Sequence, residues 1–249
     1  MNVKNYFGSC YSLCQSFFKL LNSYFCTLSN FMQHKVIIAG ASGLIGSLLL
    51  EQLLHHPDFF EVVVLVRNPL SMQHKKLKQL IVNFDRLDDY EAEINGHAIF
   101  CCLGTTKSKT PDLKEYRKID HDYPLALAKI GAKNSMQQFH LVSSLGADKN
   151  SSFFYTKLKG ETEEDVKKVK FNSIYIYQPS LLIGIRQEKR TAEPIITSLA
   201  KWIDPLLIGN LKKYRSINAE TVAKAMVNQS LKNSSGIFTY PSDQIKKLA

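Results

Sequence analysis

Short apolar runs alternate along this chain with longer segments in which apolar residues recur every three or four positions. The runs have the length and content of buried strands, and the longer segments have the period of amphipathic helices. The expected strands are residues 35–39, 61–66, 79–84, 98–103, 138–143 and 173–177, and the expected helices are residues 44–55, 120–133, 153–169 and 219–231. Such alternation is typical of a parallel sheet with helices on both faces. The pattern therefore predicts an α/β fold with a Rossmann-type, doubly wound parallel sheet.

The pattern is less regular between residues 179 and 215, after the last strong strand. We expect this segment to form a small C-terminal lobe on the substrate side, because open α/β sheets bind ligands at the carboxyl ends of their strands. Neither an internal repeat nor a long linker interrupts residues 32–249, which are expected to form a single domain.

Residues 1–31 differ from the rest of the chain. They carry two charged residues, Lys4 and Lys19, and are rich in aromatic residues and serine. They lack the basic start, apolar centre and small-residue cleavage site of a signal peptide. Three interpretations compete: a surface or membrane-contacting helix, a disordered tail, or a misassigned start with Met32 as the true first residue. The third is favoured because the first expected strand begins three residues after Met32.

Composition narrows the class of protein. A chain of 249 residues with 45% hydrophobic content can bury the core of one sizeable domain. No uncharged apolar run is long enough to span a bilayer. None of the five cysteines forms a CxxC pair or a Cys/His cluster with zinc spacing, so no metal site is expected and free thiols in a reducing cytoplasm are favoured.

The formal net charge is +10, and the basic residues are spread along the chain. A solvated basic surface explains this distribution. No motif indicates sequence-specific binding of nucleic acid. Weak peripheral contact with an acidic membrane, through this surface or through residues 1–31, is the alternative.

A glycine-rich turn joins the first expected strand to the first expected helix. Its residues are Gly40, Ala41, Ser42, Gly43, Leu44, Ile45 and Gly46. The first glycine permits a tight turn, the second lets a diphosphate approach the backbone, and the third lets helix and strand pack closely. The helix N-terminus adds free N–H groups and a partial positive charge. The turn therefore predicts binding of a dinucleotide, although the spacing is GxxGxxG rather than GxGxxG.

Arg67 directly follows the second expected strand. An acidic residue at this position would bind the ribose diol of NAD, whereas an arginine can hold the 2′-phosphate of NADP. No Asp or Glu ends this strand, so the sequence favours NADP(H) over NAD.

Two further turns are expected to line the cofactor. Asp85 follows the third expected strand. Its position in the sequence is the only reason to expect it beside the adenine. Cys102, Leu103, Gly104 and Thr105 end the fourth strand, where Gly104 would let the backbone run along the cofactor ribose.

A serine, a tyrosine and a lysine form the second constellation. Ser143 ends the fifth expected strand, Tyr155 follows twelve residues later, and Lys159 lies one helical turn beyond it. A lysine ammonium beside a phenol stabilises the phenolate and makes the tyrosine a usable acid. YxxxK alone carries little weight in a chain with eleven tyrosines; its order after the glycine turn and the serine gives it meaning.

This order resembles that of the atypical branch of the short-chain dehydrogenase/reductase superfamily, and within it the Tat-interacting oxidoreductase-like proteins and their bacterial relatives. The resemblance runs from Met32 to the end of the chain. The segments that carry it are GASGLIG at 40–46, FCCLGTT at 100–106, IDHDY at 119–123, SSLGADK at 143–149, YTKLKGE at 155–161 and RQE at 186–188.

The resemblance implies a Rossmann fold, a bound NADPH and a catalytic set of Ser143 (or its neighbour Ser144), Tyr155 and Lys159. It also places Pro179 near the nicotinamide, with Gln178 where the family usually has an arginine. The expected function is reduction of a small carbonyl substrate, with Tyr155 as the proton donor. The alternatives are a weakly catalytic NADPH-binding regulator that acts through a protein partner, and, less favoured, an epimerase with tightly held cofactor.

Overall fold

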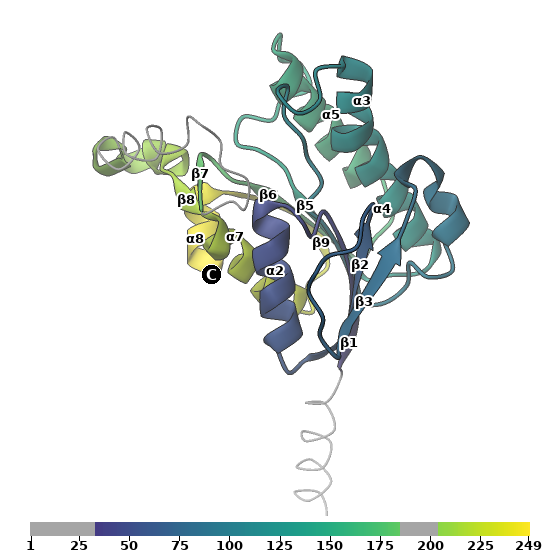
Figure 1. Ribbon diagram of the computed structural model, residues 1–249. Coiled ribbons are helices and arrows are strands. Elements are labelled where there is room, and N and C mark those ends of the chain that lie inside the picture. Colours follow the sequence, from purple (N-terminus) through teal and green to yellow (C-terminus); the bar gives the residue numbers. More distant parts are fainter. Residues whose placement is uncertain (1–32, 185–203) are drawn as a thin grey trace, which may run out of the picture.

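The computed structural model describes residues 33–184 and 204–249, and it contains a seven-stranded parallel sheet. The strand order is β3-β2-β1-β4-β5-β6-β9. The strands are β1 (His34–Ala39), β2 (Phe59–Val66), β3 (Leu77–Ile81), β4 (Ala98–Cys101), β5 (Gln138–Val142), β6 (Ser173–Gln178) and β9 (Gly236–Pro241). The Rossmann-type, doubly wound sheet predicted from the sequence is confirmed (Figure 1).

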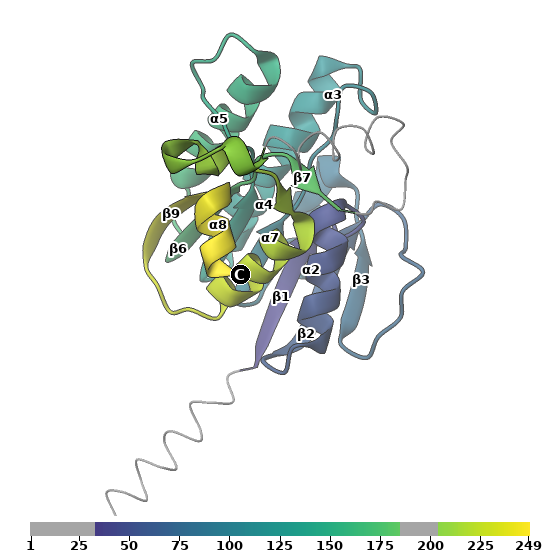
Figure 2. The same ribbon diagram turned by 90° about the vertical axis from the view of Figure 1, so that its left-hand side faces the viewer.

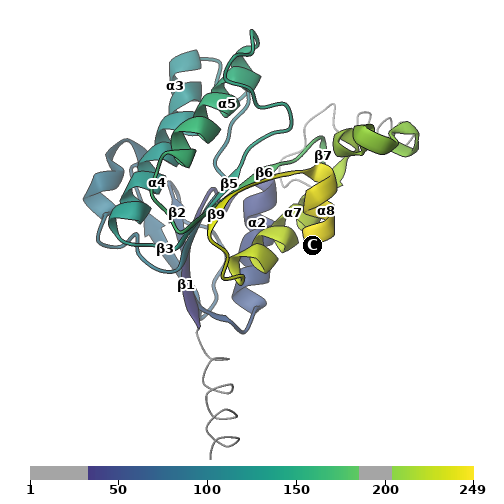
Figure 3. The same ribbon diagram turned by 180° about the vertical axis from the view of Figure 1, so that it is seen from behind.

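Helices cover both faces of the sheet (Figures 2 and 3). One face packs against α2 (Leu44–His55), α7 (Ala219–Ser230) and α8 (Ser242–Leu248), and the other against α4 (Tyr123–Lys133) and α5 (Phe154–Lys167). Two apolar cores result, one on each side. Because the central strands are buried on both faces, their sequences read as continuous apolar runs.

The winding of the chain reverses at β1. Strand β2 lies on one side of β1 and β4 lies on the other. In open α/β sheets such a switch point, at the carboxyl ends of the strands, is where ligands bind. The glycine turn follows β1 at this edge.

Several elements differ from those expected. Strand β3 begins and ends earlier than residues 79–84, and β9 was not expected. The expected helix 120–133 is broken: α3 (Leu113–Arg117) runs into a π-helical turn, η2 (Lys118–Asp122), before α4 begins with Pro124 in its first turn. The remaining short elements are η1 (Phe84–Tyr90), β7 (Leu182–Ile183), η3 (Asp204–Leu206), η4 (Gly209–Tyr214) and β8 (Ile217–Asn218).

Aromatic side chains tie β9 to the centre of the sheet. Phe100, His140, Tyr175 and Phe238 occupy one register row across β4, β5, β6 and β9, and neighbouring ring centroids lie 4.6, 4.6 and 5.2 Å apart. Burial holds the pKa of His140 well below its usual value, so the imidazole is neutral. The row extends the stacked core to the edge strand.

Residues 1–32 and 185–203 lie outside the described part of the chain. The predictions for the N-terminal extension, for the segment 186–188 and for part of the 179–215 lobe fall there. Within the described ranges, no helix combines the length and the apolar content that crossing a bilayer requires.

Candidate functional site

The glycine turn has a geometry that only glycine fits at two positions. Gly40 has φ +88°, and a Cβ there would lie 2.6 Å from the carbonyl oxygen of Cys102. A Cβ on Gly46 would lie 2.1 Å from the carbonyl oxygen of Gly40. Both side-chain positions are filled by backbone, so the turn, the start of α2 and the end of β4 are in direct contact.

The N-terminus of α2 is open to an anion. Its N-cap is Gly43, which provides no side-chain cap, and its first turn contains no acidic residue. Ser42 and Gly43 are exposed, Leu44 is half-buried, and Ile45 is buried in the core. Uncapped N–H groups and the helix dipole suit a diphosphate. The residues present therefore fit the dinucleotide predicted from the sequence.

Arg67 lies beside this turn. Strand β2 pairs with β1 so that Leu65 is opposite Ala39, and Arg67 follows two residues later at the same edge. Its side chain is exposed, and it forms no ion pair within the described residues. An exposed, unpaired guanidinium at this place is available to a phosphate.

Asp85 belongs to η1, and its carboxylate faces α4. It accepts a hydrogen bond from the Tyr123 hydroxyl at 2.9 Å and lies 3.4 Å from the ammonium of Lys118. Burial and this carboxylate raise the pKa of Tyr123 to about 12. The Asp85 N–H is also engaged, because it donates to the side chain of Asn83. Its assignment to the adenine stays a prediction.

The turn after β4 lies directly over a buried ion pair. The N–H of Cys102 donates to the carbonyl of Ala39 at 2.8 Å, and the N–H of Thr105 donates to Oδ2 of Asp120 at 2.8 Å. A Cβ on Gly104 would lie 3.6 Å from Asp120 Oδ1. Burial raises the pKa of the Cys102 thiol, so it stays protonated.

Asp120 pairs with Lys159 at 2.8 Å, and both are buried, with 1% and 7% of their surfaces exposed. Burial alone would lower the pKa of Lys159, but the Asp120 carboxylate outweighs it and the pKa is raised. The lysine therefore stays protonated and positively charged. One carboxylate thus joins the β4 turn to the lysine predicted to be catalytic.

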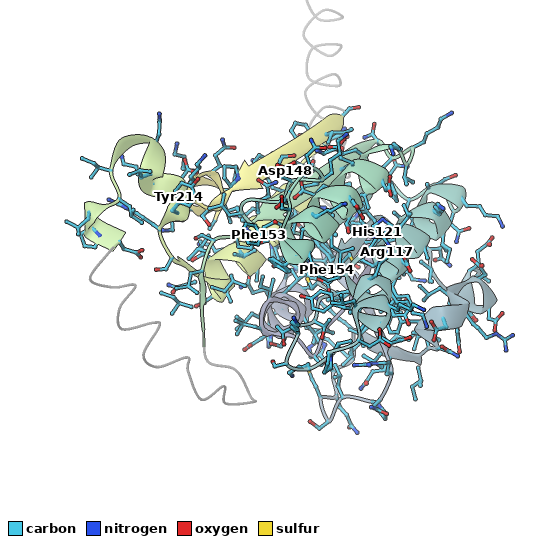
Figure 4. All side chains as sticks on the ribbon, turned by 90° about the horizontal axis from the view of Figure 1, so that it is seen from above. Arg117, His121, Asp148, Phe153, Phe154 and Tyr214 are labelled. Atoms are coloured by element: carbon cyan, nitrogen blue, oxygen red, sulfur yellow. The ribbon has the colours of Figure 1, made fainter. Side chains whose placement is uncertain are left out.

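Tyr155 lies in the first turn of α5, one helical turn before Lys159. Helical spacing puts both side chains on one face, as predicted. The tyrosine is 41% exposed, whereas the lysine is buried. Seen from above in Figure 4, its neighbours Phe153 and Phe154 lie between Tyr214 of η4 and Arg117 of α3. The phenol therefore faces solvent with a fixed cation on its own helix face.

Ser143 does not present a free proton. Its hydroxyl donates to Oε1 of Glu163 at 2.5 Å, and the Gln178 amide donates to both oxygens of the same carboxylate at 2.9 and 3.0 Å. The adjacent Pro179 is buried, and its carbonyl accepts the N–H of Leu145. The sequence predicted Ser143 as the last residue of the strand; β5 ends one residue earlier, at Val142, and the sequence did not indicate the Glu163 partner.

Sequence reasoning missed Asp120 and Glu163. Asp120 lies inside the IDHDY segment quoted above, and Glu163 lies four residues after Lys159, on the same helix face. A charged residue at a buried helical position is a signal for a paired group.

Comparisons with known proteins identify the family of this chain. A family model described as NAD(P)H-binding matches residues 40–196. Protein HTATIP2 of Rattus norvegicus is 35% identical over 214 residues, which cover 82% of this chain and 85% of that protein. Protein fmp52-1, mitochondrial, of Aspergillus oryzae is 29% identical over 214 residues, or 84% of this chain and 91% of that protein. The fungal name contains a mitochondrial location, which differs from the cytoplasmic one expected here.

Solved structures share the fold at low sequence identity. The Bordetella bronchiseptica enzyme WbmH in complex with NAD+ has a TM-score of 0.66 at 15% identity, over 86% of this chain and 79% of that one. UDP-N-acetylglucosamine 4-epimerase from Methanobrevibacter ruminantium has a TM-score of 0.63 at 16% identity, over 85% and 77%. Together, the family match, the HTATIP2 relationship and the fold show that this chain belongs to the NAD(P)H-binding short-chain dehydrogenase/reductase superfamily, in its atypical branch.

Proposed function

We propose that this protein is an NADP(H)-dependent oxidoreductase that reduces the carbonyl group of a small molecule. One observation carries the proposal. The glycine turn, the β4 turn and the Tyr155–Lys159 face meet at one edge of the sheet, and Asp120 bonds to the second and the third of them. Cofactor-binding and proton-donating groups are therefore close enough to serve one reaction.

The choice of NADP(H) over NAD depends on Arg67. The end of β2 carries no carboxylate to accept the hydroxyls of an NAD ribose, and the exposed guanidinium offers several donors to a 2′-phosphate. The glycine turn and the N-terminus of α2 would hold the diphosphate of either cofactor.

When bound, NADPH supplies a hydride to the carbonyl carbon of the substrate. The Tyr155 hydroxyl gives its proton to the carbonyl oxygen, and the product is an alcohol. The Lys159 ammonium stabilises the phenolate that remains, and its N–H groups not used by Asp120 are available to ribose hydroxyls. Asp120 keeps the lysine charged and in place. A serine hydroxyl orients the carbonyl oxygen, and positioning of these groups supplies much of the rate.

The substitution Tyr155→Phe tests this proposal because it removes only the hydroxyl. We expect NADPH to bind within about twofold of the wild-type Kd, while turnover falls by about 10²–10⁴-fold. Consumption of NADPH with a panel of aldehydes and ketones measures the turnover. Tyr240→Phe is the matched control, since Tyr240 is a partly buried tyrosine of β9 outside the candidate site, and it should keep full activity.

Two outcomes would contradict the reductase. Unchanged turnover in Tyr155→Phe would remove the tyrosine from the mechanism. If NADPH stabilises the wild-type protein but no carbonyl compound in the panel oxidises it, the regulator that acts through a protein partner becomes the better explanation.

A further inference from the structure

Two adjacent serines, Ser143 and Ser144, directly follow β5, and their surroundings differ. Ser143 is 6% exposed, and its hydroxyl donates to Glu163, which is itself 4% exposed. The Ser143 N–H donates to the carbonyl of Tyr177 at 2.7 Å. Both hydrogen-bond donors of Ser143, the hydroxyl and the N–H, are therefore engaged inside the protein.

The Glu163 carboxylate is held by neutral donors. Within the described residues it forms no ion pair, because Lys159 pairs with Asp120 at 2.8 Å and Lys167 pairs with Glu164 at 3.0 Å. Ser143 and Gln178 supply its three hydrogen bonds. An unpaired buried carboxylate depends on such donors, so removing any of them is costly. The Ser143 hydroxyl is therefore kept as a hydrogen-bond donor to Glu163.

Ser144 is less constrained. It is half-buried, and its hydroxyl donates a hydrogen bond of 3.4 Å to the carbonyl of Leu145. A bond of this length is weak. The hydroxyl can therefore rotate and donate to another oxygen.

We propose that Ser144 is the serine that touches the substrate, and that Glu163, together with Gln178, is a positioning residue that turns Ser143 away. The proposal rests on the reductase function above and assigns a residue within that site. A hydroxyl has a single proton. Ser143 gives its proton to Glu163 and keeps only lone pairs, which cannot hold a carbonyl oxygen. Ser144 has a proton available for that oxygen.

Cysteine labelling tests which serine faces the site without requiring turnover. Ser144→Cys and Ser143→Cys are treated with N-ethylmaleimide, and the modified peptides are measured by mass spectrometry against the wild-type protein, whose own five cysteines give the background. We expect position 144 to react at least tenfold faster than position 143, and NADPH to slow the reaction at 144. Equal rates, the reverse order or no protection by NADPH would overturn the proposal.

Glu163→Ala in the Ser143→Cys background tests the positioning role. Removing the carboxylate should release position 143 and raise its labelling rate at least tenfold, whereas Glu163→Gln, which keeps an acceptor, should not. Thermal unfolding of each variant shows whether it is folded. If Ser143→Cys does not fold, the proposal is decided by whether NADPH slows the labelling of Ser144→Cys.

Turnover provides the second readout. Ser144→Ala should lower kcat by about 10²-fold or more with an unchanged Kd for NADPH, as expected for loss of a donor to the reacting oxygen. Ser143→Ala should keep kcat within about fivefold, and the opposite ranking would refute the assignment. Glu163→Ala should lower kcat, and Glu163→Gln should restore it. If the wild-type protein reduces no carbonyl compound, the reductase proposal fails, while the labelling result still decides which serine is accessible.

Discussion

At the scale of the residue, the proposed preference for NADP(H) depends on Arg67. Arg67→Glu replaces a positively charged hydrogen-bond donor by a carboxylate that repels the 2′-phosphate and accepts hydrogen bonds from the ribose hydroxyls of NAD. We expect the Kd for NADPH to rise by about tenfold or more, since charged hydrogen bonds contribute about 1.5–3 kcal/mol. Fluorescence titration with NADPH and NADH measures the change. Arg86→Glu, at an exposed arginine in η1, is the control and should leave both affinities unchanged. An equal loss for both cofactors would contradict the role of Arg67.

Glu163 makes the stability of the protein depend on pH. Burial raises its pKa above the ordinary value of 4.5, although its hydrogen bonds and nearby lysines oppose the shift. Below about pH 4.5 the group is protonated in both the folded and the unfolded protein, so it has no effect on the free energy of unfolding. As the pH rises through the folded pKa, ionisation of the buried group destabilises the fold.

Glu163→Gln removes this dependence. The melting temperature of the variant minus that of the wild type should increase as the pH is raised from about 4.5 to 7. Glu164→Gln is the neighbouring control: Lys167 lowers the pKa of that partly exposed carboxyl, so its trend should have the opposite sign. A melting-temperature difference for Glu163→Gln that is constant with pH would show that the raised pKa is wrong.

At the scale of the element, the glycine turn acts as a joint between β1, α2 and β4. In Gly46→Ala the new Cβ would meet the backbone oxygen of Gly40, so the start of α2 must move. Overpacking of this kind costs about 1–3 kcal/mol. We expect a lower melting temperature by calorimetry and weaker NADPH binding. Ser42→Ala changes an exposed residue in the same turn and should have little effect on stability. Wild-type NADPH affinity in Gly46→Ala would contradict the role of the turn.

At the scale of the whole molecule, the cofactor is expected to contact several elements far apart in sequence. A ligand that binds the folded state at 100 times its Kd stabilises that state by about 2.7 kcal/mol, which corresponds to about 5–10 °C in melting temperature for a chain of this size. Thermal shift with NADPH measures this, and ATP at the same concentration is the control. Equal shifts with the two would indicate binding of the nucleotide part alone.

Sequence periodicity predicted the elements that are buried on both faces, because runs such as Val62–Val66 allow few other structures. It missed β9, where Ile237 is exposed and Gly236 and Pro241 interrupt the apolar pattern of an edge strand. The order of glycine turn, serine and YxxxK predicted the candidate site. It could not show that Ser143 bonds to Glu163 and Gln178, because these contacts depend on the rotation of α5 against β6.

The π-helical turn at Lys118–Asp122 has a consequence for how this chain tolerates changes in length. A π turn holds one residue more than the α-helical turn it replaces. Deletion of one codon before position 120 would let α3 and α4 join as a regular helix, and each residue ahead of the junction would rotate by about 100° relative to α4. The helix would become more regular, while the register that brings Tyr116 to the carbonyl of Thr105 and Arg117 to Glu161 would be lost. At this point in the gene, a one-residue deletion should therefore be more damaging than most single substitutions.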